Sequence, residues 1–376
     1  MTTPAEPVTL VRIVDHSTSA TSGSRLVPAS TLATWAGLLT LYFVWGSTYL
    51  GIRISVVSIP PFLMAGARFL IAGLLLLAWV AVRDGRDAMR LDRRQLRDSF
   101  IVGATLLGGG MGMVAFGEQT VPAGITALLI ALMPVWVAIF GRLLFGERLT
   151  RFIAAGIVIG LVGVAILVAP TGGGLAFVPI GLAAVLISPI SWGLGSLYAS
   201  HRARLPGHPL VAAAVQMVFG GLVLSAAAVA TGEVGGFSIA AVTSDAWWAF
   251  IYLITIGSLV GYTTYGWLLR VAPLPKIATY AYVNPVVAFI LGAILLGEEL
   301  SVRTIVAAAV IVTAVAIIVT ARGRAGLDAH GGSDLDADHA SVRSEPAAPQ
   351  SDGQRPGGRA SGRPGAAPAP GSTAEA

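Results

Sequence analysis

Runs of apolar residues about 20 residues long alternate with short polar links along most of the chain. At the 1.5 Å rise of an α-helix, about 20 residues cover the roughly 30 Å of hydrocarbon in a bilayer. Each run therefore predicts one membrane-spanning helix, and the links leave no room for a soluble domain between spans. The pattern predicts ten helices near residues 34–56, 61–82, 99–119, 122–145, 152–170, 180–200, 210–232, 247–272, 275–297 and 302–322.

Composition narrows the class. Of the 376 residues, 55% are apolar and 11% are charged, whereas a soluble domain carries about 25% charged residues. Lipid offers no partner to an open backbone amide, so only helices or a closed barrel can span it. The alternating segments of about ten residues that mark barrel strands are absent. We therefore predict an all-α membrane protein.

The residue types that usually carry metal or redox chemistry are missing from the apolar runs. The chain has no cysteine, and its five histidines all lie outside the runs, so we expect no metal site and no cofactor. The predicted spans hold no nucleophile beside a base and no facing pair of carboxylates, so we do not expect an enzyme. The expected partners are a small-molecule solute and the lipid bilayer, and no nucleic acid.

The two tails and the loop arginines predict the orientation. Residues 1–33 form a polar tail in which we expect no cleaved signal peptide, and residues 323–376 are rich in Gly, Pro and Ala, which predicts disorder. Cytoplasmic loops retain Lys and Arg. Arginines cluster in alternate loops, whereas the opposite loops carry at most Arg53 and Arg303. We predict a multi-pass protein of the cytoplasmic (plasma) membrane with both termini in the cytoplasm.

The two halves of the chain are related. An offset of 151 residues lays residues 132–168 on 283–319 with 12 identities in 37 positions, among them Pro134 on Pro285 and Glu147 on Glu298. The copies occupy 34–170 and 180–322 and hold five predicted helices each. Because five is odd, the second copy enters the membrane from the opposite face, so we predict two inverted five-helix repeats. Such repeats are the physical basis of alternating access in transporters.

Several stretches resemble a known family. They are the two Gly-Glu-x-Leu motifs at 146–149 and 297–300, the stretch 67–73, the Ser-Trp-Gly at 191–193 and the run 280–287. They resemble the EamA-domain proteins of the drug/metabolite transporter superfamily, and residues 118–122 and 280–287 resemble its YedA-like subgroup of bacterial inner-membrane permeases. The resemblance covers residues 34–322. It implies a ten-helix transporter with inverted repeats that exports or exchanges amino acids or other metabolites.

The prolines suggest where a solute could bind. Pro134 and Pro285 fall near the centres of the fourth and ninth predicted helices, where each removes one helical hydrogen bond. Interrupted helices at matching positions of two repeats are typical of a transporter's binding site. The alternative is a packing kink unrelated to solute.

Polar and aromatic residues cluster around these prolines at helical spacing. Their hydroxyl, amide and ring groups would suit an uncharged, zwitterionic or aromatic solute, although each could instead join helices. The binding candidates are Trp45, Ser47, Thr48, Tyr49, Thr126, Pro134, Trp192, Ser196, Tyr262, Tyr265, Thr279, Tyr280, Asn284 and Pro285.

Four charged residues need a separate interpretation. Arg68 lies well inside the second span, where it must pair, snorkel or line a wet cavity. It could contact an anion or a carboxylate of the solute, but the sequence favours pairing with a helix-end carbonyl or a glutamate. Glu118 closes the third span and is a candidate for proton coupling, unless water solvates it. Glu147 and Glu298 sit at turns, where each could cap the free amides of the next helix.

These observations favour a secondary transporter. A membrane sensor or a channel-like protein without coupled transport is the alternative, and solute-independent conductance would distinguish it. Gly156, Gly160 and Gly163 form a small-xxx-small pattern that favours close helix packing. A homodimer through such glycine-rich helices is a further possibility.

Overall fold

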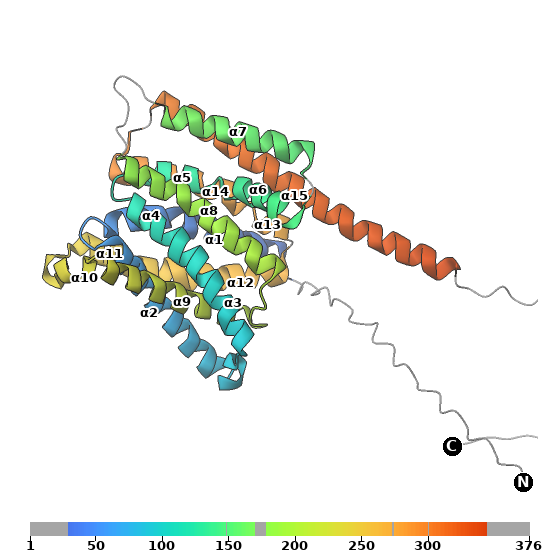
Figure 1. Ribbon diagram of the computed structural model, residues 1–376, viewed down its shortest axis with the longest axis horizontal. Helices are drawn as coiled ribbons and strands as arrows, with labels where there is room; N and C mark the ends of the chain where they lie inside the picture. Colours follow the sequence, from blue (N-terminus) through green and yellow to red (C-terminus); the bar gives the residue numbers. More distant parts are fainter. Residues whose placement is uncertain (1–28, 148, 170–177, 273, 300, 344–376) are drawn as a thin grey trace, which may run out of the picture. The chain divides into compact units, whose positions relative to one another are not determined.

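The computed structural model describes residues 29–147, 149–169, 178–272, 274–299 and 301–343. The described part of the chain is helical with no β-strand, which confirms the predicted all-α class (Figure 1). Eight helical segments are long and apolar enough to cross a membrane. They are Pro61–Arg83, Arg93–Gly117, Ala123–Phe145, Arg151–Val168, Pro179–His201, Pro209–Ala230, Ser244–Leu268 and Val302–Arg322.

The other two predicted spans are helical but do not belong to these eight. α1 (Thr31–Ser55) has 25 residues and occupies the first predicted span. α14 (Tyr280–Leu296) is apolar but only 17 residues long. The count of ten membrane crossings therefore stays a prediction.

The spans that contain Pro134 and Pro285 are each divided into two helices. α5 (Ala123–Ile130) stops just before α6 (Met133–Phe145), whose second residue is Pro134. In the second half, α13 (Leu274–Ile277) precedes α14, and Pro285 lies inside α14. The helix 122–145 and the helix 275–297 expected from the sequence are thus each interrupted.

Two π-helical segments were not foreseen. η2 (Ala104–Met111) joins α3 (Arg93–Gly103) to α4 (Gly112–Gly117), and η4 (Leu253–Val260) joins α11 (Ser244–Tyr252) to α12 (Gly261–Val271). The two lie 149 residues apart along the chain, close to the offset between the repeats. π-Helical turns are rare and are frequently found at functional sites.

The remaining helices complete the chain, and one of them ends later than expected. α15 continues past residue 322 to Arg343, because adding residues to an existing helix is far easier than starting one. The chain divides into a unit Met1–Leu327 and a unit Asp328–Ala376, of which residues 328–343 are described and helical. Residues 344–376 of the expected tail, and 1–28 at the other end, lie outside the described residues. The helices not yet given are α2 (Pro61–Arg83), η1 (Arg86–Met89), α7 (Arg151–Val168), α8 (Pro179–His201), α9 (Pro209–Ala230), α10 (Glu233–Gly236), η3 (Ile239–Ala241) and α15 (Val302–Arg343).

α2 and α9 form the most extensive helix pair, and they occupy the second span of each predicted repeat. Their backbones nearly touch. A Cβ atom on Gly66 would lie 2.9 Å from the backbone nitrogen of Ser225, and one on Gly221 would lie 2.8 Å from that of Leu70. Since real Cβ atoms do not approach so closely, glycine is required for this contact.

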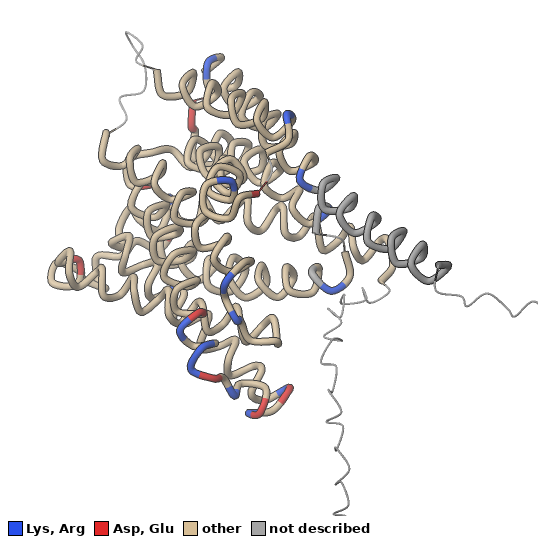
Figure 2. The backbone as a smooth tube through the Cα atoms, turned by 45° about the vertical axis from the view of Figure 1, so that its right-hand side comes forward, with Lys and Arg blue, Asp and Glu red and all other residues tan. Residues whose placement is uncertain are grey.

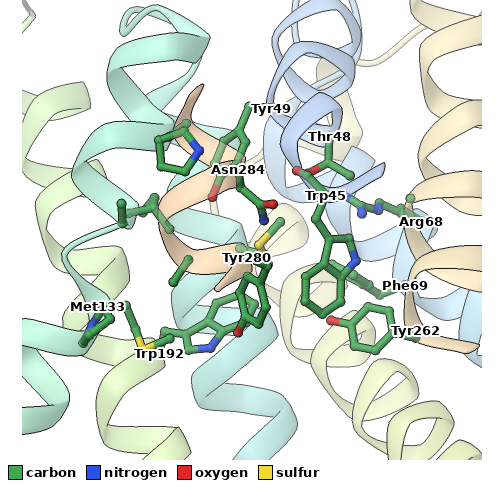
Figure 3. Close-up of a pocket in the computed structure, with 18 residues that line it drawn as sticks. Trp45, Thr48, Tyr49, Arg68, Phe69, Met133, Trp192, Tyr262, Tyr280 and Asn284 are labelled. Atoms are coloured by element: carbon green, nitrogen blue, oxygen red, sulfur yellow. The ribbon is translucent and has the colours of Figure 1, made fainter. Parts of the chain in front are cut away.

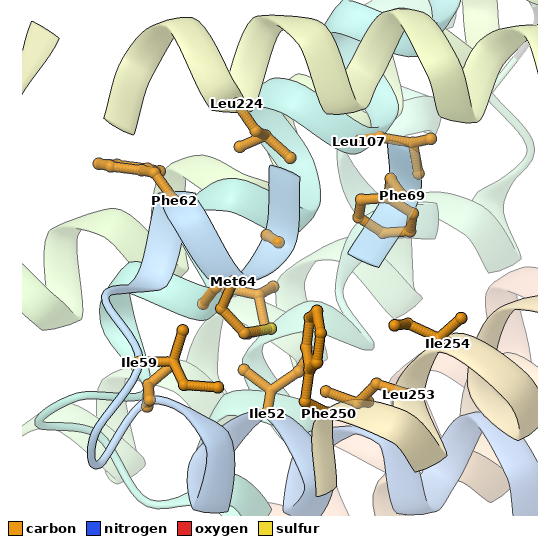
Figure 4. Close-up of a cluster of buried hydrophobic side chains, with 14 of the residues drawn as sticks. Ile52, Ile59, Phe62, Met64, Phe69, Leu107, Leu224, Phe250, Leu253 and Ile254 are labelled. Carbon is orange, nitrogen blue, oxygen red and sulfur yellow. The ribbon is translucent and has the colours of Figure 1, made fainter. Parts of the chain in front are cut away.

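The interior is apolar and lies in several clusters. The largest joins α1, α2, α9 and the α11–η4 segment around Phe69, Met64 and Leu253 (Figure 4). A second cluster packs α5, α7 and α15 together. There Gly156 and Gly163 of α7 lie against Ile318 and Ile311, so the small-residue pattern of α7 serves packing within the chain.

Many large apolar side chains point outward, as expected of a surface that faces lipid. Val82, Leu143 and Trp248, for example, are 89%, 71% and 71% exposed. Figure 2 shows charged residues gathered near helix ends, with long uncharged stretches of helix between them.

Candidate functional site

A cavity opens between the two halves beside the divided helices. It is lined by ten of the predicted residues and by eight others, and it encloses about 90 Å³. This is less than the ~300–1,000 Å³ usual for small-molecule sites, so a solute would have to part the surrounding side chains. The predicted residues in the lining are Trp45, Thr48, Tyr49, Arg68, Pro134, Trp192, Tyr262, Tyr280, Asn284 and Pro285.

Trp45 stands at the centre of an aromatic cluster. Its ring centroid lies 5.7 Å from that of Tyr262, 5.3 Å from Tyr265 and 5.1 Å from Tyr280. The Tyr262 and Tyr280 rings meet it edge to face, which is a favoured geometry for aromatic pairs. The Tyr265 ring contacts the Trp45 ring but does not line the cavity. Trp192 and Met133 lie on the opposite wall (Figure 3).

Asn284 is buried at the junction of α1 and α14. In the amide orientation that satisfies both polar ends, its nitrogen donates to the carbonyl oxygens of Tyr280 and Tyr42, both at 3.2 Å. Asn284 therefore joins two helices at the wall of the cavity.

Five of the predicted binding candidates lie outside the lining. Ser47 shares a hydrogen bond of 2.5 Å with the hydroxyl of Tyr252, and Thr279 bonds to the hydroxyl of Tyr42. Thr126 is fully buried in α5, and its hydroxyl has no hydrogen-bond partner among the described residues. Tyr265 and Ser196 also lie outside the lining. Of these, Ser47 and Thr279 join α1 to its neighbours.

Arg68 is the cation of the cavity wall. Its side chain is 3% exposed, its Nε donates to the hydroxyl of Ser258 at 3.0 Å, and its guanidinium lies 4.8 Å from the ring centroid of Phe69. Among the residues that the structure describes, no carboxylate forms an ion pair with it. Of the alternatives left open by the sequence, Arg68 thus lines the cavity.

Glu118 is buried rather than solvated. It is 0% exposed, and neither of its carboxylate oxygens has a hydrogen-bond partner in the described chain. Its backbone carbonyl accepts a hydrogen bond from Arg53 of α1. The expectation that water solvates a residue at the end of an apolar run was wrong here, because α1 covers that end.

Glu298 and Glu147 make different contacts, and neither caps the helix that follows it. Glu298 accepts hydrogen bonds from the backbone amides of Ala123 and Gly124, at 2.7 and 3.0 Å, at the start of α5. Glu147 accepts a bond of 3.0 Å from Arg322 and lies 3.3 Å from His201 Nε2. The expected caps of α7 and α15 are instead made by other residues, for α7 by Thr150. No local sequence pattern predicts these distant partners.

Sequence reasoning missed much of the apolar lining. Phe69, Met111, Met133 and Gly257 border the cavity, together with Ala127, Ile130, Ala131 and Ala281. Polar and aromatic character identifies candidates in an apolar span, so it does not identify the apolar residues of the lining. Adjacency to a candidate was the available signal, since Phe69 follows Arg68 and Met133 precedes Pro134.

The sequence profile of the EamA-like transporter family matches the chain twice, over residues 33–169 and 179–320. The chain belongs to this family. The uncharacterized inner membrane transporter YedA of Escherichia coli K12 is 42% identical over 290 residues, which cover 76% of this chain and 90% of YedA. With its apolar helices, this makes the chain a multi-pass protein of the cytoplasmic membrane.

More distant relatives carry transporter names as well. The uncharacterized transporter YvbV of Bacillus subtilis strain 168 is 27% identical over 75% of this chain and 90% of its own. A probable amino-acid metabolite efflux pump of E. coli K12 is 26% identical over 73% of this chain and 91% of its own. A solved crystal structure matches with a TM-score of 0.54 at 20% identity, covering 77% of this chain and 96% of the other, and shows the shared fold.

Proposed function

We propose that this EamA-family protein is a secondary transporter that exports or exchanges a small metabolite by alternating access. In this proposal α1 and α14 also cross the membrane, so that ten spans form two inverted repeats over residues 34–170 and 180–322. The cavity beside Trp45 and Asn284 holds the solute midway.

Matched elements in the two halves support the inverted repeat. The π-helices η2 and η4, the divided spans α5–α6 and α13–α14, and the paired helices α2 and α9 each occur once per repeat. The profile of the family also matches each half separately. Two halves built alike can exchange roles, which gives two conformations of similar energy, each open to one side.

The observation that carries alternating access is the unequal use of two equivalent glutamates. Glu298 holds the start of α5 in the other repeat, whereas Glu147 contacts Arg322 and His201 instead of the start of α13. With both termini in the cytoplasm, the Glu298 contact lies at the outer face. We infer that this conformation is closed outside, and that the opposite conformation exchanges the two contacts.

The residues that line the cavity indicate the class of the transported solute. Its aromatic and methionine walls favour a partly apolar body, and its few polar groups limit the solute to a small number of hydrogen bonds. The efflux pumps among the relatives are named for amino-acid metabolites, and that class fits these walls.

Counterflow in proteoliposomes tests the proposal. Vesicles preloaded with one amino acid or metabolite should take up the labelled solute against a gradient and saturate with its concentration. Steady, non-saturable conductance would favour a channel and contradict the proposal, as would the absence of exchange across a broad metabolite panel.

A further inference from the structure

Arg68 is a buried cation with which no carboxylate among the described residues forms an ion pair. The side chain is 97% buried in the middle of α2, and the 18 residues that line the cavity include no Asp or Glu. Glu118 acts on it electrostatically, but both Glu118 oxygens lack hydrogen-bond partners, so the two do not form an ion pair. A buried arginine normally pairs or lines a wet path.

The neighbours of Arg68 fix its orientation and leave part of its donor set free. Nε donates to Ser258, whose side chain is fully buried in η4. The terminal Nη2 lies beside Gly257, where an added Cβ would come within 3.2 Å of it and within 3.0 Å of Thr48. The π-helix thus brings one hydroxyl to the near edge of the guanidinium and removes side-chain bulk from the other. Figure 3 shows the nitrogens of Arg68 close to Trp45 and Thr48.

We propose that Arg68 binds the carboxylate of the transported solute, and that the apolar body of the solute lies against Trp45, Tyr262 and Met133. This inference rests on the proposed transport function and names the substrate class of the same cavity. A guanidinium presents a planar fork of donors that matches a carboxylate. A single cation among apolar walls matches a single negative charge, which disfavours a doubly charged phosphate.

The second repeat supports a single anchor. At the position equivalent to Arg68, offset by 148 residues, α9 carries Gln216, which does not line the cavity. One half of the protein therefore supplies the charge, and the other half supplies Trp192 and Asn284. Such a site orients a solute with one charged end.

Matched acid and amide probes test the anchor. Counterflow would be measured with leucine, phenylalanine and tryptophan, each against its carboxamide, which keeps the amine and the apolar body but lacks the carboxylate. We expect the wild type to prefer each transported acid over its amide by at least about tenfold. The ratio should approach 1 in Arg68→Gln and fall in between in Arg68→Lys, which keeps the charge without the fork. Arg151→Gln, at an exposed helix start far along the chain, serves as the control with an unchanged ratio.

The ratio is insensitive to how much folded protein each vesicle contains, so lower abundance of a variant does not imitate the result. Equal use of acids and amides by the wild type, or an unchanged ratio in Arg68→Gln, would overturn the anchor and leave the transport proposal intact. Loss of all exchange, amides included, in both Arg68 variants would assign Arg68 to the fold and overturn it too. If the wild type exchanges no solute at all, the proposed function fails and the anchor with it.

Discussion

Glu298 and Glu147 occupy equivalent positions in the two repeats, yet they have different partners. Glu298 is bound to two backbone amides at a helix start, where the helix dipole also favours a carboxylate. Glu147 is 34% exposed and is bound to side chains. The difference shows that equivalent residues of two near-identical motifs can have different partners in the same conformation. Alternating access would require such a difference.

The two glutamates would also find different numbers of backbone amide donors at the helix starts that they can contact. The start of α5 offers the amides of Ala123 and Gly124, but the equivalent residues in α13 are Leu274 and Pro275. Proline has no amide hydrogen, so Glu147 would gain one donor fewer at α13. We therefore expect the conformation closed at the outer face to be the more stable one in the absence of solute.

Removal of Asn284 should have the largest effect on transport. Asn284→Ala breaks the bridge between α1 and α14 and removes a polar side chain from the cavity wall, so we expect uptake to fall at least about tenfold, the effect of ~1.4 kcal/mol. Met133, its counterpart in the first repeat, also lines the cavity, and Met133→Ala should lower uptake only a few-fold. Counterflow at equal membrane abundance measures both.

Tyr280→Ala should rank with Asn284→Ala, because it removes one ring from the Trp45 cluster. Arg151→Gln is the control, since Arg151 is exposed and does not line the cavity. Equal uptake by all three variants would show that the cavity is not the solute site.

Removal of the Glu298 contact should open the outer face. Charged hydrogen bonds contribute about 1.5–3 kcal/mol each, so Glu298→Ala should raise the open population at least about tenfold. The chain has no cysteine, and a single Thr126→Cys, buried in α5, would therefore report opening through its rate of labelling by an impermeant thiol reagent added outside. If the Glu298→Ala variant of Thr126→Cys is labelled no faster than Thr126→Cys with Glu298 intact, Glu298 does not hold the outer face closed.

Glu147→Ala should have the smallest effect. Its partners Arg322 and His201 are 31% and 32% exposed, and such pairs contribute only about 0.2–1 kcal/mol. We expect outside labelling of Thr126→Cys to change less than about fivefold in this variant. A rise as large as that of Glu298→Ala would mean that the two glutamates act alike, and would remove the asymmetry from which the conformation was inferred.

Helix positions could be predicted from the sequence because hydrocarbon imposes length and apolarity on every span. The interruption just before Pro134 could be predicted because proline lacks an amide hydrogen, whereas the break between α13 and α14 precedes Pro285, which lies inside α14. The direction of a side chain around a helix could not, since a helix buried on all sides has no polar face to orient it. Thus Thr48 lines the cavity whereas its neighbour Ser47 faces Tyr252.

The burial of a residue by a distant helix could not be predicted from the sequence either. Glu118 ends an apolar run, which predicts contact with water, but Arg53 and the rest of α1 lie across it. The π-helices were equally hidden, because one extra residue in a turn leaves the apolar pattern almost unchanged. No local sequence pattern therefore indicated that Gly257 lines the cavity or that Ser258 accepts a hydrogen bond from Arg68.

The contact between α2 and α9 has the geometry of a two-fold dimer interface. Gly66 meets Gly221, and their counterparts Ala214 and Gly73 meet in the same way. In a dimer of identical subunits every substitution appears twice, so an arginine at position 68 would bring a second arginine with it. Joining both copies in one polypeptide ends that constraint. A gene fusion of this kind lets one half acquire a charge while the other keeps glutamine, and so gives the cavity a polarity that no symmetric pair could have.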